Sequence, residues 1–281
     1  MTATVFAAVI AAAAMHAGWN ALLKVRLDPF LALMLVTSCS GIAALPLLFT
    51  FGWPRAEAWP WLLASVALHL GYYTTLTEAY RRADMGQIYP IARGGAPLLT
   101  AIVSITVLQE PLGTIPALGV AVLAGGVILM SLKGRRIGTV LDPVAVSFAL
   151  ATAAIICGYT LVDGLGARTA GDPHAYSAAL FVLGAVPLPL ITLWRRGLSG
   201  MKPALGFLLP ALAGGAMSLG AYWIAIWAMT VAPIALVAAL RESSVLFAAL
   251  IAALVLKEPL APIRVVAATL ILVGLLLIRW H

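Results

Sequence analysis

The chain has 281 residues, of which 63% are hydrophobic and only 10% are charged, and its mean hydropathy is +1.07. A soluble domain carries about 25% charged residues, so this composition excludes a soluble globular protein and indicates a polytopic membrane protein. The net charge of +7 does not indicate a nucleic-acid partner, because Lys and Arg lie in short gaps between apolar runs, as membrane topology requires.

Ten apolar runs are long enough to cross a membrane as helices, because a helical span needs about 20 residues. Runs such as 117–130 do not alternate between apolar and polar residues, which excludes the strands of a membrane barrel. The first run lacks a basic leader, so we expect a retained span and not a cleaved signal peptide. The predicted spans are 3–23, 30–51, 59–80, 86–108, 112–132, 143–163, 175–194, 204–228, 233–256 and 260–280.

Span one carries a polar face. His16, Trp19 and Asn20 are spaced i, i+3 and i+4, so they share one side of a helix. A lipid-facing His–Asn pair would be costly, so we expect this face to point into the bundle. His16 is a candidate to bind substrate or to carry a proton, because the unperturbed pKa of histidine lies near physiological pH. The alternative is a histidine that only hydrogen-bonds between helices.

Span three carries the cluster His69, Tyr72 and Tyr73, followed by Glu78 near its end. Aromatic clusters of this kind line pockets for organic cations or aromatic side chains, or they form belts at the membrane interface. An ionisable residue inside a span is costly and is therefore a candidate functional residue. We predict that these four side chains line a cavity.

Span four contains Arg93 within an apolar run, followed by Gly94-Gly95-Ala96-Pro97. We expect a kinked or locally unwound helix here, because non-helical backbone at membrane depth survives where it lines a cavity. The span ends at Glu110-Pro111, a tight break where a helix-capping and turn role is favoured over proton transfer.

A basic gap at 133–136 separates the fifth and sixth spans. It divides the chain into a first five-helix repeat at 1–132, a linker at 133–142 and a second five-helix repeat at 143–281. Five is an odd number, so the two repeats insert upside down relative to each other. Loops after odd-numbered spans carry eleven Lys and Arg residues and the opposite loops carry three, which places the basic loops in the cytoplasm and both termini outside.

The second half of the sequence repeats several short motifs of the first half. The run Val107-Leu108-Gln109-Glu110-Pro111-Leu112 returns as Val255-Leu256-Lys257-Glu258-Pro259-Leu260. Arg93 returns as Arg241 and Gly126 as Gly274, both 148 residues later. Gly18-Trp19-Asn20 is similar to Gly158-Tyr159-Thr160, which makes Tyr159 a further candidate for the cavity. Glu258 and Pro259, like Glu110 and Pro111, are read as a structural signature of the repeat.

The last candidates lie in spans eight and nine. Span eight has the cluster Tyr222, Trp223 and Trp227 at depth, which we expect to line the pocket. Span nine has Arg241, Glu242 and Ser243 in succession. Because the halves are inverted, the two arginines should approach the midplane from opposite faces, and an arginine fork suits a carboxylate or a phosphate. The alternative is a structural role for both arginines, with Arg241 paired to Glu242 or Glu78 and Arg93 bound to a carbonyl at a helix end.

These features resemble the drug/metabolite transporter superfamily in its ten-span form with two EamA-type repeats. The resemblance is carried by the breaks at Glu110 and Glu258, by Arg93 and Arg241 upstream of them, and by the opening at 16–20, and it covers essentially the whole chain. Within the superfamily the chain looks most like an amino-acid and metabolite exporter of the YddG type, whose associated substrates are aromatic amino acids and methyl viologen. This resemblance implies a basket-shaped helical bundle, a central cavity lined mainly by spans 1, 3, 4, 6, 8 and 9, and alternating access.

We therefore predict an all-α membrane protein of two inverted five-helix repeats around a central cavity, located in the inner (plasma) membrane. It should export small metabolites, with amino acids foremost. A lipid-linked sugar or phosphate-ester carrier of the same superfamily remains open as an alternative, and a channel or a membrane-embedded enzyme is disfavoured because no catalytic motif is present. Asp163 has no partner in the sequence for an aspartyl dyad, and Cys39 and Cys157 form no metal or disulfide framework. We expect no cofactor, no metal and a monomer.

Overall fold

The computed structural model describes residues 1–22, 27–82, 85–131, 142–254 and 262–280. Within these ranges the chain forms twelve α-helices and two 3-10 helices (η1 and η2) and no strand, so the prediction of an all-α protein is confirmed. The elements are α1 (Ala3–Leu22), α2 (Pro29–Phe51), η1 (Ala56–Ala58), α3 (Trp59–Arg82), α4 (Met85–Thr106), α5 (Thr114–Ser131), α6 (Pro143–Thr169), α7 (Pro173–Gly184), α8 (Pro187–Met201), η2 (Lys202–Phe207), α9 (Leu208–Val231), α10 (Ile234–Arg241), α11 (Ser244–Leu254) and α12 (Pro262–Arg279).

Six described segments are long and apolar enough to cross a membrane, and two shorter apolar helices accompany them. The chain is therefore a multi-pass membrane protein, whereas the count of ten spans and their inverted arrangement stay predictions. The six segments are Ala3–Leu22, Phe30–Phe51, Pro143–Thr169, Pro173–Val231, Ile234–Leu254 and Pro262–Arg279, and the shorter helices are Ile91–Thr106 and Thr114–Met130.

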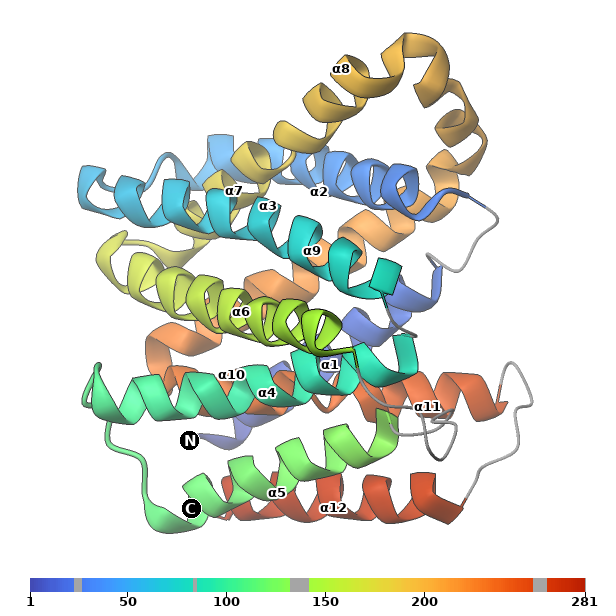
Figure 1. The fold of residues 1–281 in the computed structure, drawn as a ribbon. Coiled ribbons are helices and arrows are strands. Elements are labelled where there is room, and N and C mark those ends of the chain that lie inside the picture. Colours follow the sequence, from blue (N-terminus) through green and yellow to red (C-terminus); the bar gives the residue numbers. More distant parts are fainter. Residues whose placement is uncertain (23–26, 83–84, 132–141, 255–261, 281) are drawn as a thin grey trace.

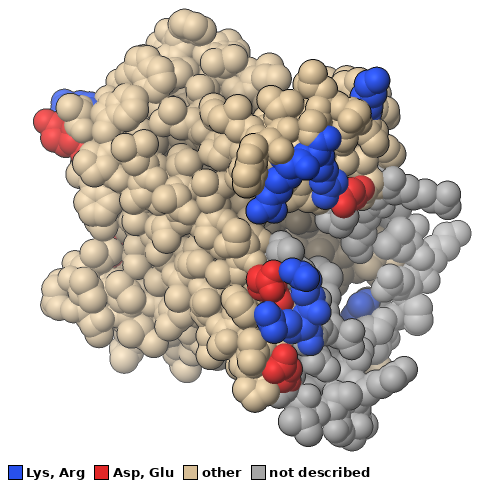
Figure 2. All heavy atoms as spheres, turned by 45° about the horizontal axis from the view of Figure 1, so that its top comes forward, with Lys and Arg blue, Asp and Glu red and all other residues tan. Residues whose placement is uncertain are grey.

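The helices run mostly across the view of Figure 1, so that their ends gather on its left and right sides, with both chain termini on the left. Figure 2 shows charged side chains at the upper left edge and in the right half of the face in view, with an uncharged surface between them. Two clusters of ion pairs are exposed, one joining Glu78 to Arg81 and Arg82 and the other joining Asp28 to Arg196. This distribution fits a belt of lipid around the middle of the bundle.

Two predicted spans are each divided into two helices. Span seven becomes α7 and α8, because Pro187 lacks the backbone N–H that would continue the hydrogen bonds of α7. Span nine becomes α10 and α11, separated by Glu242 and Ser243. Conversely, α4 is continuous through Arg93 to Pro97, so the local unwinding that we predicted in span four is wrong, and the interruption lies in the second repeat instead.

The last helices of the two predicted repeats, α5 and α12, pack side by side at the bottom of Figure 1. The repeat-related Gly126 and Gly274 both lie in this interface. A Cβ atom on Gly126 would stand 2.7 Å from Ile271 Cγ1 and 2.9 Å from Ile271 N, and one on Gly274 would stand 2.7 Å from Leu123 N. The two backbones thus approach so closely that only glycine fits at these points.

Neighbouring glycines on α5 provide a test of this packing. Gly126→Ala is expected to destabilise the protein by about 1–3 kcal/mol, since overpacking a close contact forces the backbones apart. Gly125→Ala is the matched control, because a Cβ there meets no atom within 4 Å. It should be neutral or slightly stabilising, as alanine is the better helix former. Thermal unfolding of both variants in detergent checks the expectation, and equal melting temperatures would contradict it.

The predicted topology is testable with cysteines at exposed positions. Glu57 in η1 and Ser199 in α8 are both exposed, and the charge count places the first outside and the second in the cytoplasm. The native Cys39 and Cys157 are buried and give little background. A membrane-impermeant thiol reagent applied to intact cells should label Glu57→Cys well and Ser199→Cys poorly. The opposite pattern would invert the topology.

Candidate functional site

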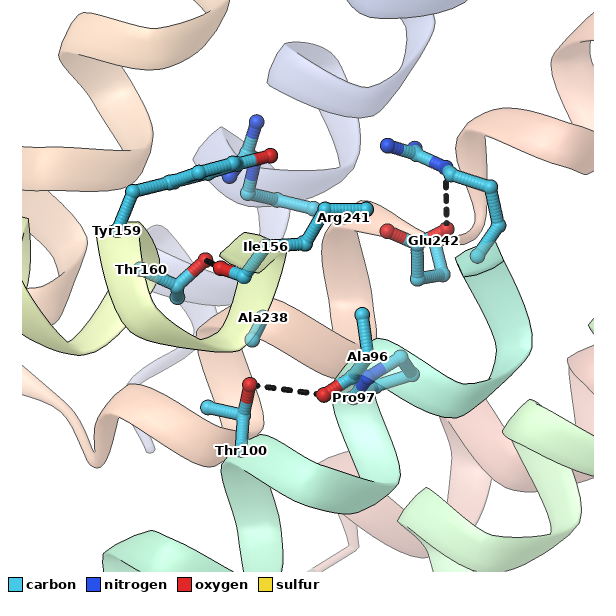
Figure 3. Close-up of a pocket in the computed structure, with 10 residues that line it drawn as sticks. Ala96, Pro97, Thr100, Ile156, Tyr159, Thr160, Ala238, Arg241 and Glu242 are labelled. Carbon is cyan, nitrogen blue, oxygen red and sulfur yellow. Dashed lines mark hydrogen bonds and ion pairs between the residues drawn. The ribbon is translucent and has the colours of Figure 1, made fainter. Parts of the chain in front are cut away.

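A buried pocket lies between α4, α6 and α10 (Figure 3). Its cavity volume is only about 10 Å³, the room that about one water molecule needs. A substrate the size of an amino acid therefore requires the surrounding helices or side chains to move apart. The lining residues are Arg93, Ala96, Pro97 and Thr100 of α4, Ile156, Tyr159 and Thr160 of α6, and Ala238, Arg241 and Glu242 at the end of α10.

An ion pair closes one side of the pocket. Arg93 Nε lies 3.2 Å from Glu242 Oε2, and the two side chains are only 11% and 7% exposed. Figure 3 marks this contact with a dashed line from Glu242. The pairing differs from the one that we weighed for Glu242, which was with its neighbour Arg241. A buried arginine thus holds a carboxylate of the protein itself inside the pocket.

The backbone changes its hydrogen bonding at Glu242. The N–H groups of Glu242 and Ser243 donate to carbonyls three residues earlier, those of Ala239 and Leu240, instead of four. The Ser243 hydroxyl is also committed to the Leu240 carbonyl, at 2.7 Å. A short stretch of 3-10 geometry inside a helix often marks a hinge, so α10 and α11 are joined at a point suited to bending.

The second arginine faces an aromatic wall. Arg241 Cζ lies 4.7 Å from the centre of the Tyr222 ring, within the range of a cation–π contact. Tyr159 lines the pocket and stacks on His69, with ring centres 4.3 Å apart, and the edge of His69 meets Tyr222. Tyr72 stands edge-on to Tyr159. Candidate residues from spans three, six, eight and nine therefore meet around one pocket.

Asp163 is the residue that our reading of the sequence missed. Its side chain is fully buried in α6 and accepts hydrogen bonds from Tyr176 of α7 and Tyr222 of α9. The predicted sixth span ends at residue 163, whereas α6 continues to Thr169 and places Asp163 inside the bundle. The sequence contains a signal for Asp163, because a carboxylate inside an apolar helix is a candidate functional group.

The polar face of span one is present but lies outside the pocket lining. Trp19 Nε1 donates to His16 Nδ1 at 3.3 Å, and the amide of Asn20 donates to the His16 carbonyl at 2.7 Å. Both contacts stay within α1. Arg93 and Arg241 lie within electrostatic range of His16, so α1 borders the charged region without contributing to the cavity itself.

Other predicted site residues lie elsewhere. Glu78 pairs with Arg81 and Arg82 at the end of α3. Trp223 donates to His174 Nδ1 at 2.8 Å in a separate aromatic cluster with Phe51. Tyr73 packs on Tyr72, and Trp227 packs on the main hydrophobic core. Glu258 and Pro259 lie outside the described residues.

Glu110 links the start of α10 to Arg168 of α6. Its carboxylate accepts from the N–H of Ile234, the first residue of α10, at 3.0 Å and pairs with Arg168 NH1 at 2.6 Å. Arg168 in turn donates to the carbonyls of Met229 and Ala232, at the end of α9. Glu110 therefore caps a helix of the other repeat, and Arg168 caps the helix before it.

Comparison with known proteins adds independent findings. A family model described as the EamA-like transporter family matches residues 2–132 and 144–280. One solved structure, described only as the crystal structure of a protein, is similar with a TM-score of 0.76 over 99% of this chain and 96% of that chain. Its sequence identity is 17%, so the likeness shows the fold alone. No curated protein matches this chain.

Proposed function

Because the chain belongs to the EamA-like transporter family, and family members are transporters and not enzymes, we propose that it exports small metabolites that carry a carboxylate group across the inner membrane. Amino acids, aromatic ones included, are the substrate class that we favour. The observation that carries the proposal is the Arg93–Glu242 pair in the pocket between α4, α6 and α10. A site that already holds one carboxylate on a buried guanidinium has the charge and geometry to exchange it for another.

The aromatic wall supports the same substrate class. Tyr159 lines the pocket, and His69 and Tyr222 lie behind it. Planar rings of this kind stack on an aromatic side chain or on an extended apolar one. A phosphate ester is favoured less, because a doubly charged phosphate would be repelled by Glu242 at the edge of the same pocket.

Transport by alternating access is the mechanism that we propose for this chain. The pocket is too small for an amino acid as it stands, so binding must be linked to movement of the helices around it. The 3-10 turn at Glu242 and Ser243 is a suitable hinge, since it joins the paired residue directly to α11.

A flux assay tests this function. Purified protein in proteoliposomes is assayed against aromatic amino acids, aliphatic amino acids and sugar phosphates, with Arg241→Met beside the parent. We expect flux of one or more amino acids that Arg241→Met strongly reduces. Arg279→Met is the matched control, because that arginine is exposed at the end of α12 and should leave flux unchanged. Flux of sugar phosphates alone would reject the amino-acid assignment.

A further inference from the structure

Asp163 differs in its partners from Glu242, the other acid that is buried among the described residues. Glu242 is held by a guanidinium, which can only donate hydrogen bonds and therefore favours the charged carboxylate. Asp163 is held by the hydroxyls of Tyr176 and Tyr222, and Ser65 offers a third. In the part of the chain that the structure describes, no Lys or Arg forms an ion pair with Asp163.

Hydroxyl partners satisfy an acid in both of its protonation states. A hydroxyl donates to a carboxylate and, after rotating, accepts from a carboxylic acid, so its hydrogen bond survives when the proton arrives or leaves. Both carboxyl oxygens of Asp163 can therefore keep a hydrogen bond whether the proton is bound or absent, whereas losing one would cost about 1–3 kcal/mol. This is the property that a reversible proton site in a membrane needs.

His16, the carrier that we considered first from the sequence, lacks this property. Its Nδ1 accepts from the indole N–H of Trp19, a group that can only donate. Protonation of that nitrogen breaks the contact. His69 Nδ1 lies 2.9 Å from the carbonyl of Ser65, which can only accept, so this contact favours the tautomer with its hydrogen on Nδ1.

Tyr222 connects Asp163 to the pocket. Its hydroxyl donates to Asp163, and the face of its ring lies under Arg241, which lines the pocket. One side chain thus contacts both the buried acid and the guanidinium that faces the substrate. Several ionisable groups lie around Asp163 and the pocket, on the helices that pack there: His69 of α3, Arg93 of α4, Tyr159 of α6, Tyr176 of α7, Tyr222 of α9, and Arg241 and Glu242 of α10. Glu57 of the neighbouring η1 is exposed.

The charges of this region balance. With the histidines neutral, Arg93 and Arg241 contribute two positive charges, and Glu242 and Asp163 contribute two negative ones. A substrate carboxylate that takes the place of Glu242 on Arg93 leaves the charge of Glu242 buried without that guanidinium, which is costly. A proton bound at Asp163 offsets this negative charge.

We propose that Asp163 is a proton-binding site coupled through Tyr222 to the pocket, so that one proton and one carboxylate group bind together. The coupling rests on the proposed function, whereas the proton site itself does not. Linkage makes the effect reciprocal, because a bound carboxylate must favour the proton as much as the proton favours the carboxylate.

The first part of the test measures proton binding without any substrate. Infrared difference spectra of the purified protein, recorded as the pH is stepped, show the carbonyl band of each carboxyl group that becomes protonated. We expect a band in the parent and in His16→Gln that is missing from Asp163→Asn. In Tyr222→Phe, which removes one hydroxyl partner, the band should shift. A spectrum that neither Asp163→Asn nor Tyr222→Phe alters would overturn the proposal, and Tyr222→Phe suffices if the aspartate variant does not fold.

The second part measures coupling in proteoliposomes, with L-phenylalanine as the probe and a pH-sensitive dye inside. An imposed gradient of L-phenylalanine should move protons in the parent, and Asp163→Asn should carry L-phenylalanine without protons. Flux in the parent without proton movement overturns the coupling and leaves the proposed function standing. The Asp163 band without any L-phenylalanine flux supports the proton site and counts against the proposed substrate, so the two failures are distinguishable.

Discussion

Arg93→Ala is expected to lower substrate flux by at least about tenfold, because it removes a charge-assisted contact from the pocket. The structure adds a second effect. Glu242 would remain buried without its partner, and breaking a buried ion pair from one side costs about 3–5 kcal/mol of stability. Loss of flux in this variant alone therefore does not separate binding from folding.

A double replacement separates them. Arg93→Met with Glu242→Leu removes both charges and fills the space with apolar groups of similar size, which is often neutral or stabilising. We expect its melting temperature in detergent to return close to that of the parent while flux stays low. Arg93→Lys should keep stability and restore flux only in part, because lysine lacks the planar fork. Parent-like flux in the double variant would show that the pair is only structural.

Arg168→Ala is expected to open the face of the bundle at which α9 ends and α10 begins. The change removes the ion pair to Glu110 and two hydrogen bonds to carbonyls of α9. Losing these contacts should destabilise the state in which this face is closed by about 1–3 kcal/mol relative to the state in which it is open. This corresponds to about a 5- to 150-fold rise in the population of the open state. If access to the pocket alternates between faces, this change favours access from the outside.

Cysteine accessibility measures that population. Ala238 lies on α10 one turn beyond Ile234 and lines the pocket, so Ala238→Cys reports when the face opens. Its labelling by an impermeant thiol reagent added outside should rise in Arg168→Ala and in Glu110→Gln. Arg55→Ala is the control, because that arginine is exposed on the same predicted side. An equal rise in labelling in Arg55→Ala would show that the effect comes from general destabilisation of the helical bundle.

The sequence predicted the helices better than their interruptions. Runs of apolar residues identify membrane helices because lipid leaves the backbone no other hydrogen-bond partner. Gly94, Gly95 and Pro97 suggested a break in span four, yet α4 keeps its helical bonds because a proline removes only one of them. The break came instead at Glu242 and Ser243, where a serine hydroxyl competes for a backbone carbonyl. That competition depends on local geometry that composition does not reveal.

The candidate site was predictable where the two repeats match. Arg93 and Arg241 were singled out by their common offset, and both line the pocket. The pairing of Arg93 with Glu242 was not foreseen, because Glu242 has no counterpart in the first repeat, where Gly94 occupies its place. Asp163 was overlooked for a related reason, since the tyrosines that hold it lie 13 and 59 residues further along the chain.

The close packing of α5 on α12 also has a consequence for synthesis. Gly126 and Gly274 are 148 residues apart, so α5 is synthesised long before α12, the helix on which it packs. At about 5–20 residues per second, the ribosome takes roughly 7–30 s to complete that stretch. During this time the glycine surface of α5 faces lipid or the insertion machinery. The chain therefore acquires this helix–helix contact only after α12 has been made, and a truncation that removes α12 leaves α5 with an open interface for the quality-control proteases of the membrane to recognise.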